Sequence, residues 1–145
     1  MSDITVVKNN TNQLEVTYDV DKLLFGGNQF IDANVTASGA DVVMLEGMIM
    51  GRIGSTKLLT PADKDANDGS QFPVGICIRT RTVTNGTTEA ITLVNKGKIA
   101  VSKVNFLSTE TLDTLIGAAN NQRSYRDYLN DLGIVLESAD ELTKI

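Results

Sequence analysis

The chain has 145 residues, a formal net charge of −5, one cysteine and no histidine. This length suits one domain with a hydrophobic core that needs neither a metal nor a disulfide. Acidic residues prevail at both ends of the chain and basic residues in its middle, but no lysine and arginine run is interleaved with aromatic residues, so we expect no nucleic-acid binding. No apolar run approaches the roughly 18 residues of a membrane span, and no secretory leader precedes the first polar residues, so neither a membrane partner nor secretion is expected.

Residues 1–40 are rich in asparagine, aspartate and threonine, and their apolar residues alternate with polar ones. This period of two is typical of strands with one covered face. Two interpretations remain open: two hairpins packed on the core, or an arm that lends its strands to a neighbouring subunit. We therefore divide the chain into an N-terminal arm or edge-strand segment, 1–40, and a β-rich body, 41–145. The candidate partner-binding residues of the arm are Ile4, Val6, Leu14, Val16 and Tyr18.

Two continuous apolar runs, Val42–Ile53 and Val74–Ile78, predict buried strands at the centre of the body. The first run is broken at Glu46–Gly47, which indicates two short strands or one bent strand. The second contains Cys77, and its apolar neighbours predict a buried, unreactive thiol.

The polar connector between these runs has a spacing that could suit a calcium loop, because Asp63, Asp65 and Asn67 alternate near a glycine. A loop of the EF-hand type needs glycine at its sixth position and glutamate at its twelfth. Counted from Asp63, these positions hold Asp68 and Val74. We therefore predict no metal site here, and a β-turn at 67–69 in which aspartate and asparagine side chains bond the backbone.

An Asn85–Gly86 pair lies between two β-prone runs and predicts a hairpin, with Val83, Ile91 and Val94 as packing residues. Gly97 is expected to break the second run before a further alternating strand, 99–104. Arg79 and Arg81 are predicted to share an exposed strand face, where they are either solvated or opposite an acidic partner.

From Ser108 the apolar period changes to that of a helix, with Leu112, Leu115, Ile116 and Ala119 on one stripe. A second stripe runs from Tyr125 to Leu132 and is expected to end at Gly133. Residues 134–136 then predict a last strand. The fold class is thus mainly β, a small β-barrel or β-sandwich-like body, with a short helix pair near the C-terminus.

The sequence contains few of the residues and motifs on which enzyme catalysis commonly depends. Without histidine the chain lacks the commonest general base and metal ligand, and it has neither a nucleophile elbow nor a phosphate-binding loop. The paired carboxylates Asp63 and Asp65 have no aromatic platform nearby, as a glycosidase would need. We predict a protein that is not an enzyme, with no catalytic residues and no cofactor.

The order of elements resembles the head decoration (cement) proteins of tailed bacteriophages, of the lambda-like group, over about residues 40–137. The strand LEGMIMGRI at 45–53 is followed by the loop ANDGSQFPVGI at 66–76, the strand KGKIAVSKV at 96–104 and the closing segment YLNDLGIVLE at 128–137. The matching positions are Asp68–Gly69, Val74–Gly75–Ile76 and Leu132–Gly133–Ile134.

This resemblance implies a β-rich structural protein that forms a homotrimer, sits at the three-fold sites of the outer capsid surface and clamps neighbouring major capsid subunits. It implies synthesis in the bacterial cytoplasm and a final location on the virion. Two rivals are a carbohydrate- or ligand-binding β-module of a phage fibre, which the absence of tryptophan disfavours, and another structural subunit of a tail or baseplate.

Overall fold

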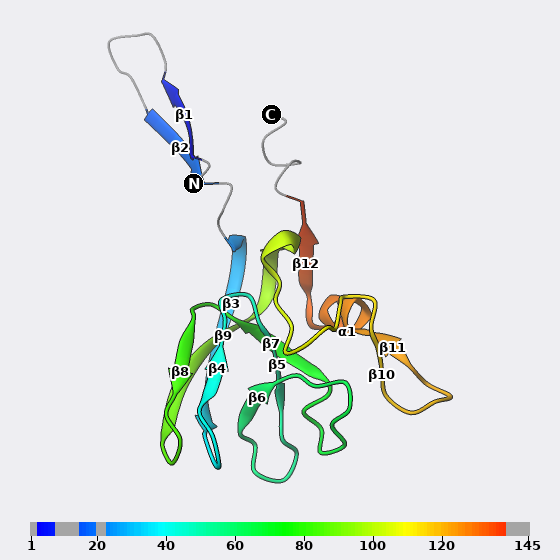
Figure 1. The fold of residues 1–145 in the computed structure, drawn as a ribbon. Helices are drawn as coiled ribbons and strands as arrows, with labels where there is room; N and C mark the ends of the chain where they lie inside the picture. The colour runs from blue at the N-terminus through cyan, green and yellow to red at the C-terminus, as the bar shows by residue number, and fades with distance from the viewer. Residues whose placement is uncertain (1–2, 8–14, 20–22, 139–145) are drawn as a thin grey trace.

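The computed structural model describes residues 3–7, 15–19 and 23–138, and strands dominate them (Figure 1). The strands are β1 (Asp3–Val7), β2 (Glu15–Asp19), β3 (Leu24–Thr36), β4 (Val42–Met44), β5 (Ile49–Arg52), β6 (Leu59–Pro61), β7 (Pro73–Cys77), β8 (Arg81–Val83), β9 (Thr88–Ala100), β10 (Leu115–Ile116), β11 (Arg123–Ser124) and β12 (Ile134–Glu137). One helix, α1 (Tyr125–Leu132), and a short 3-10 turn, Val101–Lys103, complete the described elements. The predicted mainly β fold is confirmed.

The main sheet is built around β9. Along one edge β9 pairs antiparallel with β3, and along the other it pairs antiparallel with β7 and parallel with β12. Beyond β7 the sheet continues through β5 to β6. It curls until β6 lies close to β3, but no backbone pairing joins these two strands in the described part of the chain. Of the two predicted body types, the closed barrel is therefore absent and the sandwich-like arrangement is found.

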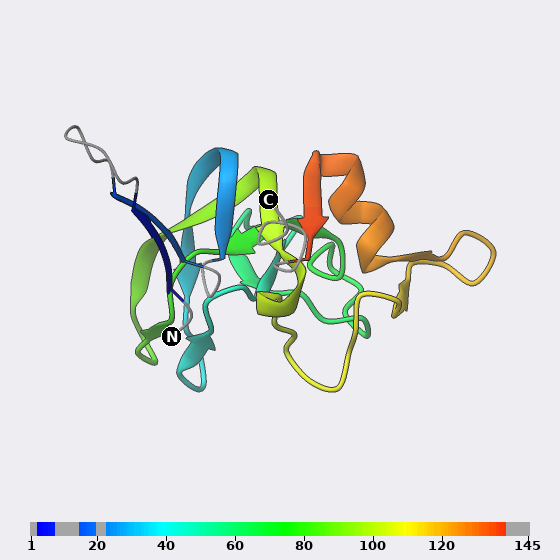
Figure 2. The same ribbon diagram turned by 90° about the horizontal axis from the view of Figure 1, so that it is seen from above.

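The second layer of the sandwich is a small sheet formed by β4 and β8. Its inward residues Met44 and Val83 pack against Val35 of β3 and Ile91 of β9, and all four are fully or nearly fully buried. Figure 2 shows this layered region at one end of the body and α1 at the other.

The continuous apolar runs of the sequence are explained by a main sheet that is covered on both faces. Residues of one strand alternate between the two cores. Ile76 of β7 packs toward α1 and β12, whereas its neighbour Cys77 packs toward the β4–β8 layer. The predicted division of the first run is confirmed, because β4 and β5 are separate strands around Glu46–Gly47.

The turn at Asn85–Gly86 does not make the predicted hairpin. β8 pairs with β4 and β9 pairs with β3, so the turn leads from one layer of the sandwich to the other. Gly86 N–H donates to the carbonyl of Ala37, in the turn after β3, at 2.8 Å. The Asn-Gly pair predicts a tight turn correctly, but burial of Val83 and Ile91 in one core requires their strands to face each other through side chains.

The predicted break at Gly97 is also wrong, because β9 continues through it to Ala100. The ladder with β3 absorbs the irregularity as bulges between Leu24 and Phe30. Gly97 has a φ of +117°, and a Cβ there would lie 2.7 Å from the Cα of Asn28. Glycine here permits a close approach of two strands instead of ending one of them.

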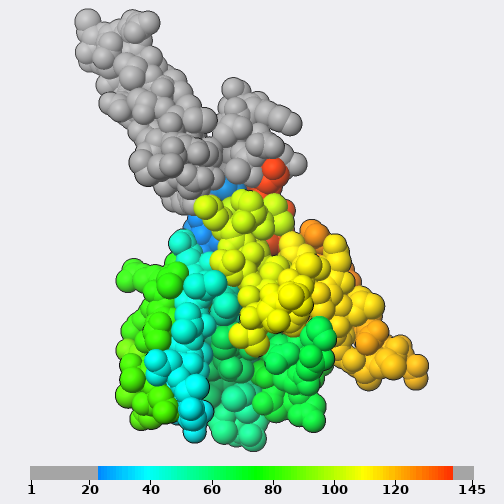
Figure 3. All heavy atoms as spheres, in the orientation of Figure 1, coloured from blue at the N-terminus to red at the C-terminus, as the bar shows by residue number. Residues whose placement is uncertain are grey.

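The predicted helix pair is wrong in its first member, since 108–121 contains turns and the two-residue strand β10. Its backbone carbonyls bond outside the segment: Leu112 accepts from Arg126 N–H and Thr114 from Tyr125 N–H. The first-turn amides of α1 have no partner within their own helix, and these carbonyls satisfy two of them. Two members of the expected apolar stripe, Leu112 and Ile116, are nevertheless buried in the core. Figure 3 shows the segment (yellow) lying on the surface of the body.

The second helix and the last strand are confirmed. Ser124 caps α1 by accepting from Asp127 N–H at 3.2 Å, and Gly133 ends it in the left-handed conformation with φ of 90°. β12 follows at once and lies parallel to β9. The described residues include no helix with the length and apolar character to span a membrane.

Candidate functional site

The N-terminal hairpin carries the candidate partner-binding residues. β1 and β2 pair antiparallel, with Ile4 opposite Tyr18 and Val6 opposite Val16. These four positions are thus two cross-strand pairs and lie on one face of a two-stranded sheet. Leu14 lies outside the described residues. Their role in binding a partner stays a prediction.

The hairpin forms a sheet of its own and pairs with no strand of the body among the described residues. Each of its strands uses one edge for the other, and at its second edge each strand has no backbone partner among the residues that the structure describes. Such edges accept a further strand from another chain. The proposed boundary at residue 40 stays a prediction too, although β3 already contributes to the main sheet of the body.

An open groove of about 460 Å³ lies where β3, β9 and the start of β12 meet. Phe25 and Val135 contribute apolar surface, and Val135 is 48% exposed. Lys96 and Lys98 contribute positive charge, of which Lys98 is paired with Glu137 at 3.6 Å. In Figure 1 this end of the body is the one nearest to the hairpin β1–β2. The groove therefore adds a mixed apolar and basic surface beside the predicted arm.

Large apolar side chains are exposed elsewhere on the body too. Val43 and Leu45, at and just after β4, are 50% and 40% exposed. Leu45 borders a second open groove with Lys103 and Asn105. Single exposed apolar side chains are common on protein surfaces, so these residues do not by themselves mark a binding site.

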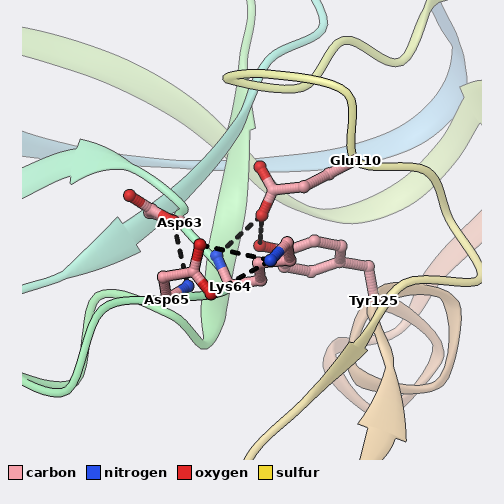
Figure 4. A network of polar contacts seen from close by, with 5 residues as sticks. All are labelled: Asp63, Lys64, Asp65, Glu110 and Tyr125. Carbon is pink, nitrogen blue, oxygen red and sulfur yellow. Dashed lines mark hydrogen bonds and ion pairs between the residues drawn. The ribbon is translucent and has the colours of Figure 1, made fainter.

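The buried carboxylate of Glu110 holds the surface segment 108–121 to the rest of the body (Figure 4). Glu110 is only 7% exposed, and its Oε1 accepts from the Lys64 N–H at 2.6 Å and from the Tyr125 hydroxyl at 2.9 Å. Burial, and then the bond to Glu110, raise the pKa of Tyr125 above its usual range. The phenol is therefore a neutral donor, and the network serves structure, since both contacts of this oxygen are internal.

Aspartate side chains of the acidic connector bond the backbone as predicted, but its hydrogen-bonded turns lie at 63–66 and 69–72, on either side of the predicted turn at 67–69. Asp63 accepts from the Asp65 N–H at 2.9 Å, and Asp68 accepts from both the N–H and the hydroxyl of Ser70. These bonds to Ser70 lower the pKa of Asp68. In the described part of the chain no three acidic, histidine or cysteine side chains gather closely enough to hold a metal ion.

Cys77 is buried as predicted, with 1% of its surface exposed. Its thiol donates to the carbonyl of Arg79, and burial raises its pKa. A raised pKa keeps the sulfur as the less nucleophilic thiol. Cys77 is therefore not a nucleophile in this state of the protein.

Sequence reasoning did not find the groove beside the arm. Its residues come mostly from three strands, and Gly97 was interpreted as a break between elements. The available signal was the combination of Gly26–Gly27 with Gly97, because glycines in two long strands indicate a close approach of backbones.

A family model described as bacteriophage lambda head decoration protein D matches residues 12–125. The match includes β2 of the hairpin, the groove strands β3 and β9, and the segment that holds Glu110. No curated protein matches the chain significantly.

Proposed function

The chain belongs to the family of bacteriophage lambda head decoration protein D, a family of structural proteins of the viral capsid, and from this we propose how it binds the phage head. As a member it is a capsid decoration protein of the outer virion surface. We propose that it is a homotrimer at the three-fold sites of the shell, where each copy clamps neighbouring major capsid subunits. It is made in the cytoplasm of the bacterial host. The family match carries this proposal.

The hairpin β1–β2 supplies the contact with the major capsid protein. It forms a sheet separate from the body sheet, and within the described part of the chain each of its strands has one edge without a backbone partner. Each main-chain hydrogen bond formed by strand addition contributes about 1 kcal/mol. About six such bonds would suffice to hold a protein on a shell when several copies act together. Ile4, Val6, Leu14, Val16 and Tyr18 are the contact residues in this proposal.

The body positions this arm. β3 is the next strand of the chain after the hairpin, and it forms the longest ladder of the body with β9. The exposed Val135 and Lys96, which has no ion-pair partner among the described residues, line the groove at the same end. The groove therefore offers a second contact with the shell next to the arm.

Deleting residues 1–20 tests the role of the hairpin. The truncated protein should keep the circular dichroism and the thermal midpoint of the body, and it should no longer sediment with expanded empty capsids. A matched control replaces only Ile4 and Val6 with serine in the full chain, which keeps its length. Normal capsid binding by the truncated protein would exclude the hairpin as the contact. A truncated protein that does not fold would assign the hairpin to the body.

Light scattering tests the trimer. We expect a mass three times that of the chain, whose mass is 15.6 kDa, on the shell or at raised concentration in solution. Cross-linking on decorated capsids should give a trimeric product. Only monomeric and dimeric products on capsids at full occupancy would rule the trimer out.

A further inference from the structure

One stretch of β9 lacks a neighbouring strand. On the edge opposite β3, the pairing of β9 with β7 covers only Leu93 and Val94. β7 ends at Cys77, and the next strand, β8, crosses to the other layer to pair with β4. No described strand therefore pairs with β9 on this edge between Thr88 and Ala90, while the same residues are fully paired with β3 on the other edge.

The backbone of Ala90 points toward this open edge. Cys77 N–H donates to Met48 O, on the side of β5. Neighbouring residues of a strand direct their N–H and C=O groups to opposite sides, so Ile76 directs these groups to β9, where its partner is Val94. Val94 in turn directs its own groups to the β7 side of β9. Residues two apart in a strand direct their N–H and C=O groups to the same side. Ala90, four residues before Val94, thus faces the same side. The guanidinium of Arg81 donates to the Ala90 carbonyl at 3.3 Å, in agreement with this direction.

A small pocket opens beside the edge. It has a volume of about 150 Å³ and is lined by Cys77, Ile78, Arg79, Arg81, Ile91 and Thr92. Arg81 is held in place by Glu89 at 3.1 Å in addition to its bond to Ala90. Arg79 is exposed and forms no ion pair with any described residue. Beside the pocket, the guanidinium of Arg81 is thus fixed by Glu89, and that of Arg79 has no ion-pair partner in the described part of the chain.

We propose that this edge of β9 and the pocket beside it bind an extended, acidic segment of a shell subunit, with one carboxylate side chain of that segment paired to Arg79. The proposal rests on the proposed capsid-binding function and adds a second contact, separate from the N-terminal hairpin. Strand addition combines main-chain bonds at an edge with pockets for alternate side chains. The Ala90 N–H supplies the former, since the Ala90 carbonyl already accepts from Arg81, and the pocket has room for one side chain.

The charges decide the chemistry of the occupant. Arginine binds carboxylates through two parallel hydrogen bonds, and an ion pair shielded by a partner is stronger than one in open water. Glu89 is already engaged with Arg81, which leaves the Arg79 guanidinium as the positive charge beside the pocket that a carboxylate of the partner would pair with. A basic or uncharged segment would leave the Arg79 guanidinium without a partner at the interface, which is unfavourable.

The test uses the full chain and expanded empty capsids as the probe. Arg79→Glu should weaken capsid binding about tenfold or more, because it places a carboxylate opposite a carboxylate. Lys57→Glu is the matched control, since it makes the same change of net charge at an exposed position outside the pocket, and it should bind normally. In the unaltered protein, amide hydrogen exchange at Ala90 should slow on capsids, because its N–H gains an acceptor.

Four outcomes separate the possibilities. Weaker binding of Arg79→Glu alone, with slower exchange at Ala90, supports the site. Equal binding of both variants with unchanged exchange overturns it. Slower exchange at Ala90 on raising protein concentration without capsids assigns the edge to a second copy and also overturns it. Normal binding of Arg79→Glu, together with loss of binding on deletion of residues 1–20, overturns this site and leaves the proposed function intact.

Discussion

The bond between Tyr125 and Glu110 gives the sharpest test of what holds the body together. Tyr125→Phe removes one hydroxyl and keeps the ring, which is 1% exposed and packs near Phe106. Glu110, itself 7% exposed, then keeps the Lys64 N–H but loses the phenol donor. A hydrogen bond to a charged group contributes about 1.5–3 kcal/mol, so we expect the free energy of unfolding to fall by about 2 kcal/mol.

A double-mutant cycle isolates this bond. Glu110→Gln keeps an acceptor oxygen but removes the charge. We therefore expect this single variant to lower the free energy of unfolding by less than the double variant Glu110→Gln with Tyr125→Phe. We expect a coupling energy of about 1–2 kcal/mol between the two positions, because residues in one hydrogen-bond network are not additive. Urea unfolding followed by circular dichroism measures each variant. All samples need one protein concentration, since association shifts the midpoint.

Alkaline pH provides a second readout. Burial, and then Glu110, raise the pKa of Tyr125, so the folded protein holds the phenol proton at pH values where the unfolded chain releases it. The resulting stability is fully present below the ordinary tyrosine pKa of about 10 and is lost as the pH rises above it. The urea midpoint of the unaltered protein should therefore fall more steeply above that pH than the midpoint of Tyr125→Phe. A Tyr125→Phe protein within about 0.5 kcal/mol of the original, with an additive cycle and an equal alkaline slope, would refute this account.

Three further predictions concern the body. Gly51→Ala should prevent folding, because its Cβ would lie 1.9 Å from the Ser70 carbonyl oxygen. Gly54→Ala, whose Cβ would lie 3.2 Å from its nearest atom, should still give a folded domain. Soluble yield and circular dichroism compare the two variants, and equal behaviour would contradict the close approach at Gly51. Ser124→Ala should lower the free energy of unfolding by about 1 kcal/mol, since the Asp127 amide loses its cap, and Ser124→Asp should restore most of it in urea unfolding. Chelators and reductants should leave the thermal midpoint unchanged, and a drop of several degrees with EDTA would reinstate a metal site at Asp63, Asp65 and Asp68. The buried Cys77 should likewise react with a thiol reagent far more slowly in the native protein than in urea.

Several elements were predictable because their causes are local. The runs at 42–53 and 74–78 predict buried strands from their own composition, and they are β4, β5 and β7. Helix α1 was found with its end at Gly133, because an amphipathic stripe followed by a glycine is a signal within one short segment. The strand β12 and the buried Cys77 follow from apolar residues in the same way.

The errors share a different cause. Residues 112–119 have a helical apolar period, but their backbone is engaged by α1: Leu112 O accepts from Arg126 N–H and Thr114 O from Tyr125 N–H. Asn85–Gly86 is a tight turn, yet which strand each side pairs with depends on β3 and β4, far away in the chain. Gly97 interrupts the pattern, but β3 and β12 hold its strand on both sides.

The candidate binding surfaces divide along the same line. Alternation alone singled out Ile4, Val6, Val16 and Tyr18, and the hairpin pairs them across its two strands. The groove of Phe25, Lys96 and Val135, and the open edge at Ala90 beside Arg79, exist only because strands distant in sequence meet or separate. The sequence determined the strands and the helix whose signals are local, such as β5, β7, α1 and β12, because side-chain alternation and caps act over a few residues. Tertiary structure alone decided which backbone edges remain without a partner, because a hydrogen-bonding edge is open or closed according to what the rest of the chain places beside it.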